Sequence, residues 1–214
     1  MSIFGKEWLK FEASINHGYF EEYLKLIKSK VEEENKRLSK IVNETEQAIQ
    51  LEKDEGYTEQ ANSYLENLGF ELDQFEQLMY RSFHITWFVF VENLFGDVCK
   101  HLKEERKELF GYKDITGSGI GRSVKYLEKL LGQPPILDKD IDNQFKLAWK
   151  IRNSFVHADS LISKDDLIFF KKYIKENPNL LHIRGQNRIE LTFPYIESLL
   201  KLSSGIVNGL HSHF

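Results

Sequence analysis

The stretch FHITWFVFVENLFGDVC, residues 83–99, is the most apolar segment of this 214-residue chain. Its polar residues Glu92, Asn93 and Asp97 interrupt the run, whereas a membrane-spanning helix needs about 20 consecutive, predominantly apolar residues. A shorter apolar run of this kind is typical of a helix buried in a protein core. We therefore predict a helix over roughly residues 59–107 whose second half forms the centre of the core.

The spacing of apolar residues before this segment predicts another long helix. Between Leu24 and Ala48 the apolar residues recur at intervals of three, four and seven, which is the period of an amphipathic α-helix. Residues 1–133 contain no proline, so no helix-breaking residue of that kind interrupts this range. The segment KDEGYTEQ, residues 53–60, is predicted to be the turn between the two helices, with Thr58 as a candidate N-cap.

Shorter elements are predicted in the second half of the chain. The pattern of apolar residues and breakers indicates helices over roughly 121–132, 138–158 and 163–175, the last with Ser163 as its N-cap. The segment LLHIRGQNRIELTF, residues 180–193, alternates loosely around a Gly-Gln-Asn turn and favours a small β-hairpin. Pro194 suits the first turn of a final helix that ends near residue 211.

The predicted elements define an all-α protein. We expect an up-and-down bundle of long helices, with a small C-terminal β-hairpin and a final helix. A chain of this length suits a single domain over residues 1–214. Within it, residues 17–175 are interpreted as the core bundle and residues 176–214 as an extension made of the hairpin and the final helix.

Composition places the chain among ordinary globular proteins. Hydrophobic residues make up 41% of the sequence, charged residues 29%, and the net charge is -4. The single Cys99 cannot form an intrachain disulfide, which favours a reducing, intracellular compartment. The N-terminal residues lack the apolar segment of a signal peptide. We therefore expect a cytoplasmic protein that is not inserted in a membrane.

Charge is distributed unevenly along the chain. Residues 21–76 contain 15 acidic and 7 basic side chains, whereas residues 146–175 contain 7 basic and 3 acidic ones. The basic region is either a solvated helix face or a surface that tolerates a polyanion such as RNA.

The basic region includes KIRNSFVHADS, residues 150–160, where an arginine falls among apolar residues. On a helix, Arg152 lies on the arc that carries Trp149 and Val156. An isolated buried charge costs several kcal/mol or more, so this guanidinium needs an acidic partner, a subunit interface or an anion. Glu92 is the candidate acidic partner, and the alternative for Glu92 is a position facing solvent.

The same helix carries a line of polar side chains that suits phosphate chemistry. Lys146, Lys150, Asn153 and His157 follow one another at intervals of four, three and four. The imidazole of His157 can exchange a proton near neutral pH. An arginine that holds a phosphate beside such a histidine is sufficient for metal-free cleavage of RNA. The alternative is a structural arginine and an exposed histidine.

Each polar side chain of this line has an expected role. Asn153, one helical turn before His157, can orient the imidazole or contact the phosphate. Lys146 and Lys150 are expected to bind the RNA backbone.

This motif, in a chain of long helices, resembles the HEPN superfamily. The resemblance lies in Arg152-Asn153-Ser154-Phe155-Val156-His157 near the end of a late helix, and in the apolar helix TWFVFVENLF. It implies a homodimer in which two such motifs share one cleft, and metal-independent endoribonuclease activity. It also implies an association with toxin–antitoxin or phage-defence systems. One subgroup has a tyrosine two residues after the histidine, where this chain has Asp159.

Other patterns give no functional site. The glycines at 117, 119 and 121 lack the preceding strand and the Lys-Ser/Thr pair of a phosphate-binding loop. His211 and His213 have no nearby carboxylates and make a poor metal site, so we expect no metal and no cofactor. The alternative function is a catalytically silent helical module of the same shape that serves as a binding or dimerisation partner. The two differ in whether the motif faces an open cleft or is covered by the C-terminal region.

Overall fold

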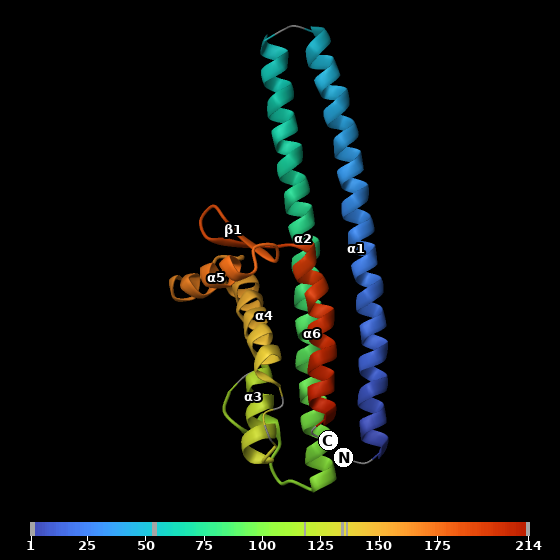
Figure 1. Cartoon of the computed structure of the whole chain (residues 1–214), viewed down its shortest axis with the longest axis vertical. Helices are drawn as coiled ribbons and strands as arrows, with labels where there is room; N and C mark the ends of the chain where they lie inside the picture. The colour runs from blue at the N-terminus through green and yellow to red at the C-terminus, as the bar shows by residue number, and fades with distance from the viewer. Residues whose placement is uncertain (1–2, 53–54, 118, 134, 136, 213–214) are drawn as a thin grey trace.

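Two long antiparallel helices form the frame of the molecule (Figure 1). The computed structural model describes residues 3–52, 55–117, 119–133, 135 and 137–212. Helix α1 covers Ile3–Glu52 and α2 covers Glu55–Arg106. At 1.5 Å per residue, each is about 75 Å long. The long amphipathic helix and the long core helix predicted from the sequence are therefore confirmed.

In Figure 1, α3, α4 and α6 lie beside the lower part of this frame, and α5 and the hairpin project from it near its middle. The hairpin pairs its strands antiparallel, with Leu181 opposite Leu191. The predicted all-α fold with a small hairpin and a final helix is confirmed. In chain order the elements are η1 (Tyr112–Asp114), α3 (Gly119–Lys125), the π-helical turn η2 (Tyr126–Leu130), α4 (Lys139–Ala158), α5 (Lys164–Glu176), β1 (Leu181–Arg184), β2 (Arg188–Leu191) and α6 (Phe193–Ser212).

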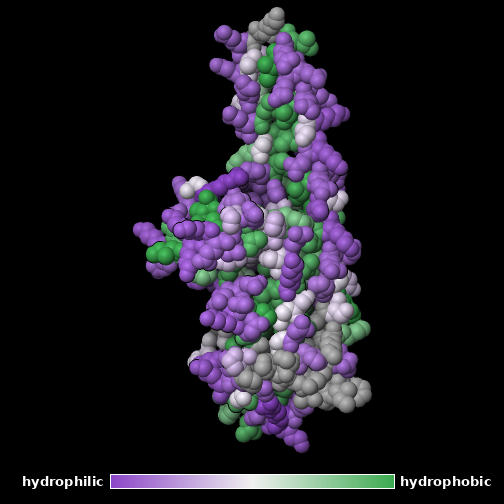
Figure 2. All heavy atoms as spheres, in the orientation of Figure 1, coloured by the Kyte–Doolittle hydropathy of each residue, from purple (hydrophilic) through white to green (hydrophobic). Residues whose placement is uncertain are grey.

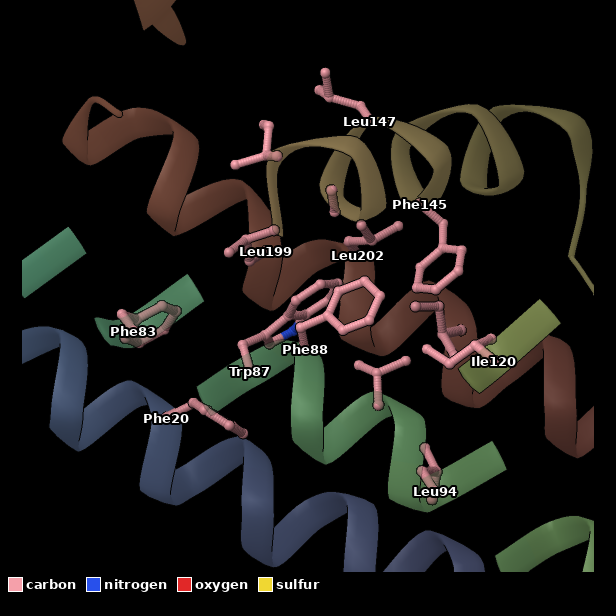
Figure 3. Close-up of a cluster of buried hydrophobic side chains, with 14 of the residues drawn as sticks. Phe20, Phe83, Trp87, Phe88, Leu94, Ile120, Phe145, Leu147, Leu199 and Leu202 are labelled. Atoms are coloured by element: carbon pink, nitrogen blue, oxygen red, sulfur yellow. The ribbon is translucent and has the colours of Figure 1, made fainter. Parts of the chain in front are cut away.

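The apolar segment of α2 forms the centre of the core, as predicted. Trp87 and Phe95 are fully buried there, and Figure 3 shows the side chains that α1, α4 and α6 contribute around this segment. The rings of Phe88 and Phe145 stack with their centroids 5.7 Å apart. The Trp87 indole donates a hydrogen bond of 2.5 Å to the hydroxyl of Ser203 on α6. The core thus continues beyond residue 175 into the final helix.

Some predicted boundaries were wrong. Helix α2 begins at Glu55, so Thr58 lies inside the helix and does not cap it, while residues 53–54 of the predicted turn lie outside the described residues. Helix α3 begins at Gly119, two residues before the start predicted for it near residue 121. By contrast, the hydroxyl of Ser163 accepts a hydrogen bond of 3.1 Å from the backbone N–H of Asp166, as an N-cap does.

A buried histidine on α2 connects this helix with α4 and α6. His84 is fully buried, with Nε2 3.1 Å from the carbonyl oxygen of Ala148 and Nδ1 3.1 Å from the hydroxyl of Tyr195. A neutral ring satisfies both contacts if Nε2–H donates to the carbonyl and Nδ1 accepts from the phenol. Burial lowers the pKa of His84 to about 3, and the nearby charge of Arg152 acts in the same direction. His84 is therefore a neutral bridge between α2, α4 and α6.

This bridge predicts a loss of stability in mild acid. The unfolded chain protonates His84 below its ordinary pKa of 6.5, whereas the folded protein does not until about 3. Stability should therefore fall as the pH drops through that window, by about 2 kcal/mol between pH 7 and pH 5. Urea unfolding followed by circular dichroism at the two pH values measures this loss. His84→Gln, which cannot titrate, should be less stable at pH 7 but should lose most of the pH dependence. An unchanged pH dependence in that variant would contradict the prediction.

None of the described helices combines the length and the apolar character needed to cross a membrane.

Candidate active site

A cavity of about 730 Å³ lies beside the second half of α4. Helix α4 supplies one wall, α2 and the start of α3 supply another, and the turn into α5 closes the end. Three of the residues proposed to act on RNA, Arg152, Asn153 and His157, all line it. The lining residues are Phe88, Glu92, Gly119, Ile120, Trp149, Lys150, Arg152, Asn153, Ser154, His157, Ala158, Leu161, Ile162, Ser163, Asp166 and Phe170.

The motif residues meet around one guanidinium group. Arg152 Nη1 lies 3.2 Å from Asn153 Oδ1, to which it donates, and 3.5 Å from His157 Nε2. Nε2 can accept a hydrogen bond from this donor only in the neutral ring that carries its proton on Nδ1. The predicted constellation of Arg152, Asn153 and His157 is thus assembled within a single chain by the local geometry of the last turns of α4.

The guanidinium of Arg152 keeps capacity for an anion. The side chain is half-buried and lies over the ring of Phe88, with its central carbon 5.9 Å from the ring centroid. Among the described residues, no carboxylate lies within 4.0 Å of it. A guanidinium has five N–H donors, and its contacts with Asn153 and His157 use one nitrogen. The remaining donors can bind a phosphate or carboxylate in the bidentate manner typical of arginine.

The predicted ion pair between Glu92 and Arg152 is absent from the part of the chain that the structure describes. Both side chains line the cavity, but no nitrogen–oxygen distance between them falls within 4.0 Å. Arg152 packs over Phe88 instead. Glu92 is half-buried beside Gly119, where a Cβ atom would lie 3.3 Å from its Oε1. Because Gly119 also has a positive φ of 57°, a larger residue would be strained there.

The two lysines expected to bind RNA occupy different environments. Lys150 lines the cavity, donates to Asp166 and lies 5.3 Å from the ring centroid of Phe169. This hydrogen bond lowers the pKa of the Asp166 carboxyl group. Lys146 lies outside the cavity lining and pairs with Asp142 on the exposed face of α4. Of the two, only Lys150 is therefore placed beside Arg152 and His157.

The loop glycines have a packing role that sequence reasoning missed. A Cβ atom at Gly121 would lie 3.1 Å from the ring of Trp149, so this glycine allows α3 to lie directly against α4. Gly119 likewise allows the start of α3 to lie close to Glu92 on α2. The cluster of three glycines was the signal in the sequence, since closely spaced glycines often mark a close approach of two segments. Phe170 and Ser163 were also not predicted to line the cavity.

The end of α4 is fixed immediately after the motif. Asp159 adopts a left-handed backbone conformation with φ of 45° and ends the helix. Its carboxylate accepts a hydrogen bond of 2.7 Å from Arg188 on β2, and this contact lowers the pKa of Asp159. Asp159 thus ties the end of the motif helix to the hairpin.

The described residues contain no group of three His, Cys, Asp or Glu side chains arranged to hold a metal ion. His211 is on α6, and His213 lies outside the described residues. No family model, curated protein or solved structure matches the chain. Any functional conclusion must therefore come from the geometry of the cavity and from the motif.

Proposed function

We propose that the protein is a metal-independent endoribonuclease of the HEPN type. The observation that carries this proposal is the convergence of Arg152, Asn153 and His157 on one cavity. Arg152 Nη1 lies 3.2 Å from Asn153 Oδ1 and 3.5 Å from His157 Nε2. The cavity combines a guanidinium that has no carboxylate within 4.0 Å among the described residues, a solvent-exposed imidazole and aromatic walls. Guanidinium groups bind phosphate, imidazole transfers protons near neutral pH, and aromatic rings stack on unpaired bases.

The proposed reaction uses a nucleophile within the substrate. His157 removes the proton of a ribose 2′-hydroxyl, and the resulting oxygen attacks the adjacent phosphorus. The bond from phosphorus to the 5′-oxygen then breaks, and that oxygen receives a proton. Arg152 stabilises the additional negative charge on the phosphorus centre. The products carry a 2′,3′-cyclic phosphate and a 5′-hydroxyl group, and DNA, which lacks the nucleophile, is not cleaved.

The experiment that tests this proposal is incubation of the purified chain with structured RNA in EDTA. Cleavage that yields cyclic phosphate ends supports it. Cleavage that EDTA abolishes, or cleavage of DNA at a similar rate, contradicts it. A chain that binds RNA or a protein partner without cleaving it would support the second function, a catalytically silent module of the same shape.

The proposal includes a homodimer that pairs the α4 helices of two chains. Beside the motif, α4 exposes Trp149 and Val156, whose side chains are 37% and 46% exposed. A second copy of α4 would cover these apolar side chains and bring two His157 side chains toward one cleft. The second histidine would then supply the proton that the leaving oxygen receives.

Sedimentation at micromolar concentration is expected to show this dimer. Val156→Glu should dissociate it and lower RNA cleavage, because the new carboxylates would be buried in an apolar contact. Leu26→Glu is the matched control, since Leu26 is at least as exposed as Val156, at 56%, but lies on α1. A parent chain that sediments as a monomer, or cleavage unaffected by Val156→Glu, would contradict the dimer.

Lys150 is expected to contribute more to RNA affinity than Lys146. Lys150→Ala should weaken binding and reduce the slope of log affinity against log salt by about one. Lys146→Ala, on the exposed face of the same helix, should have a smaller effect. Fluorescence anisotropy with labelled RNA, in a His157→Ala background that prevents cleavage, measures both. Equal effects of the two variants would show that the RNA does not enter the cavity.

As the biological context we propose toxin or phage-defence activity that is controlled by an antitoxin protein. This part of the proposal rests on the resemblance of the motif to the HEPN superfamily. Expression of the parent chain should then arrest cell growth, while His157→Ala at the same protein level should not.

A further inference from the structure

The outer half of the α1–α2 hairpin extends beyond the rest of the molecule (Figure 1). We define the distal arm as residues 32–52 and 55–76. Its innermost part on α2 still contacts the β-hairpin, through the ion pair of Asp73 with Arg184 at 2.8 Å. Its helices continue for about 30 Å past the body of the bundle. Among the described residues from 32 to 79, only Ala61 is buried. Figure 2 shows the apolar side chains as a stripe along the arm between polar margins. The two helices therefore cover their apolar residues only in part.

The apolar seam of the arm has two edges with different chemistry. Seam residues follow one another at alternating intervals of three and four, as in a two-helix coiled coil. On one edge, Arg37 and Glu71 precede the seam residues Leu38 and Leu72 and line one hollow with them. This edge has the opposite charges that usually flank a coiled-coil seam. The seam residues are Leu38, Ile41, Thr45 and Ala48 on α1, and Ala61, Leu65, Leu68, Leu72 and Phe75 on α2.

The other edge is apolar. Val42 and Ile49 each follow a seam residue by one position on α1, and both are half-buried. In an antiparallel pair of helices, residues that come one position after a seam residue lie on the same edge in both helices. Gly69 comes directly after Leu68 on α2, so it lies on the edge that carries Val42 and Ile49. A Cβ atom at Gly69 would meet no atom within 4 Å, so the space above it is open. This edge therefore offers an apolar surface with room for another helix.

In the body of the molecule, α6 occupies the same edge. The buried Ile27 continues the series of seam residues on α1 into the body. Lys28 follows Ile27 by one position, and its Nζ lies 5.6 Å from the ring centroid of Phe193. Phe193 is the first residue of α6. Beyond it, Figure 1 shows α1 and α2 continuing without α6 beside them. Val42 and Ile49 thus continue the surface on which α6 packs.

The charge of the arm indicates the occupant. The distal arm has twelve acidic and three basic residues. Glu46 lies between Val42 and Ile49 on α1, while Glu59 and Glu66 lie on the corresponding side of α2. Among the described residues, none of these three carboxylates has a basic nitrogen within 4.0 Å. A second copy of the arm would bring the same charge, and RNA would be repelled, so the complementary occupant is a cationic protein segment.

We propose that the distal arm is a docking site for a basic amphipathic helix of a partner protein. This helix, of about 18 residues, would lie in line with α6. Its apolar face would contact Val42, Ile49 and Gly69, and its lysines or arginines would lie against Glu46, Glu59 and Glu66. The site is separate from the cavity beside α4, so its test does not depend on ribonuclease activity.

Two synthetic peptides test the proposal with the full chain. One is an amphipathic helix of about 18 residues, with leucine on one face and lysine on the other. The other has the same leucines with glutamate in place of lysine. Fluorescence anisotropy should show that the lysine peptide binds and that its affinity falls with salt. Binding of both peptides with equal affinity, or of neither, would overturn the proposal.

Variants of the arm locate the binding. Val42→Gln/Ile49→Gln should weaken binding of the lysine peptide at least about tenfold, because apolar area is no longer buried. Glu46→Gln/Glu59→Gln/Glu66→Gln should weaken it about fivefold and flatten its salt dependence. Leu26→Gln, an exposed leucine on α1 outside the arm, should leave it unchanged. Circular dichroism verifies that each variant keeps its helices. Unaltered affinity in the Val42/Ile49 variant, or an arm-dependent self-association of the chain in sedimentation, would overturn the proposal.

Discussion

Replacement of His157 by alanine is expected to lower the rate of RNA cleavage about 10²–10⁴-fold, the usual contribution of a general acid or base. The imidazole is exposed at the cavity, 3.5 Å from Arg152 Nη1, and the motif contains no other histidine and no carboxylate that could act as a general acid or base. Single-turnover cleavage of end-labelled RNA in EDTA measures the effect, because it excludes product release. The change should appear in the rate at saturating protein.

His182→Ala is the matched control for this prediction. His182 is an exposed histidine on β1 that does not line the cavity. Its loss should leave the cleavage rate unchanged. If His157→Ala cleaves at the parental rate, or if both histidine variants lose activity equally, the motif is not the catalytic centre.

Replacement of Arg152 by alanine is expected to reduce cleavage to a similar extent. Arginine is the cation that the structure places between Asn153 and His157, and its unpaired donors are suited to the charge that develops on phosphorus. Arg152→Lys should restore only part of the activity, since an ammonium group lacks the planar fork that binds two phosphate oxygens. The loss should concern the rate at saturation more than the affinity for RNA.

Arg184→Ala is the comparison variant for Arg152. Arg184 is exposed on β1 and pairs with Asp73 at 2.8 Å and with Glu190 at 2.7 Å, surface contacts each worth about 1 kcal/mol or less. Circular dichroism distinguishes a catalytic loss from unfolding, because Arg152 also packs over Phe88. Full restoration by lysine would show that only the positive charge is needed.

Features that depend on local chemistry were predictable from the sequence. Ser163 caps α5 because its hydroxyl reaches a backbone N–H three residues later. The motif residues of α4 assemble because helical spacing alone brings Asn153 and His157 to one side. The hairpin was predictable from its Gly-Gln-Asn turn, and the start of the final helix from Pro194, because both signals act on the neighbouring backbone alone.

Features that depend on distant packing were not predictable. Whether Glu92 reaches Arg152 depends on how α2 lies against α4, and the structure places Phe88 under the guanidinium instead. The partner of His84 on α6, Tyr195, is 111 positions away in the sequence. The start of α2 was also placed wrongly, because the helix begins at Glu55 and Thr58 therefore lies inside it.

The contacts between α6 and the earlier helices have a consequence during protein synthesis. The motif residues leave the ribosome before Tyr195 and Ser203, which hold His84 and Trp87 beneath α4. Contacts of such large sequence separation form late, since the intervening chain must first be made and closed. A nascent chain that ends before residue 193 therefore lacks the support of its own cavity. We expect ribosome-bound chains of that length to be inactive on RNA, which would delay the proposed cleavage until synthesis of the chain is complete.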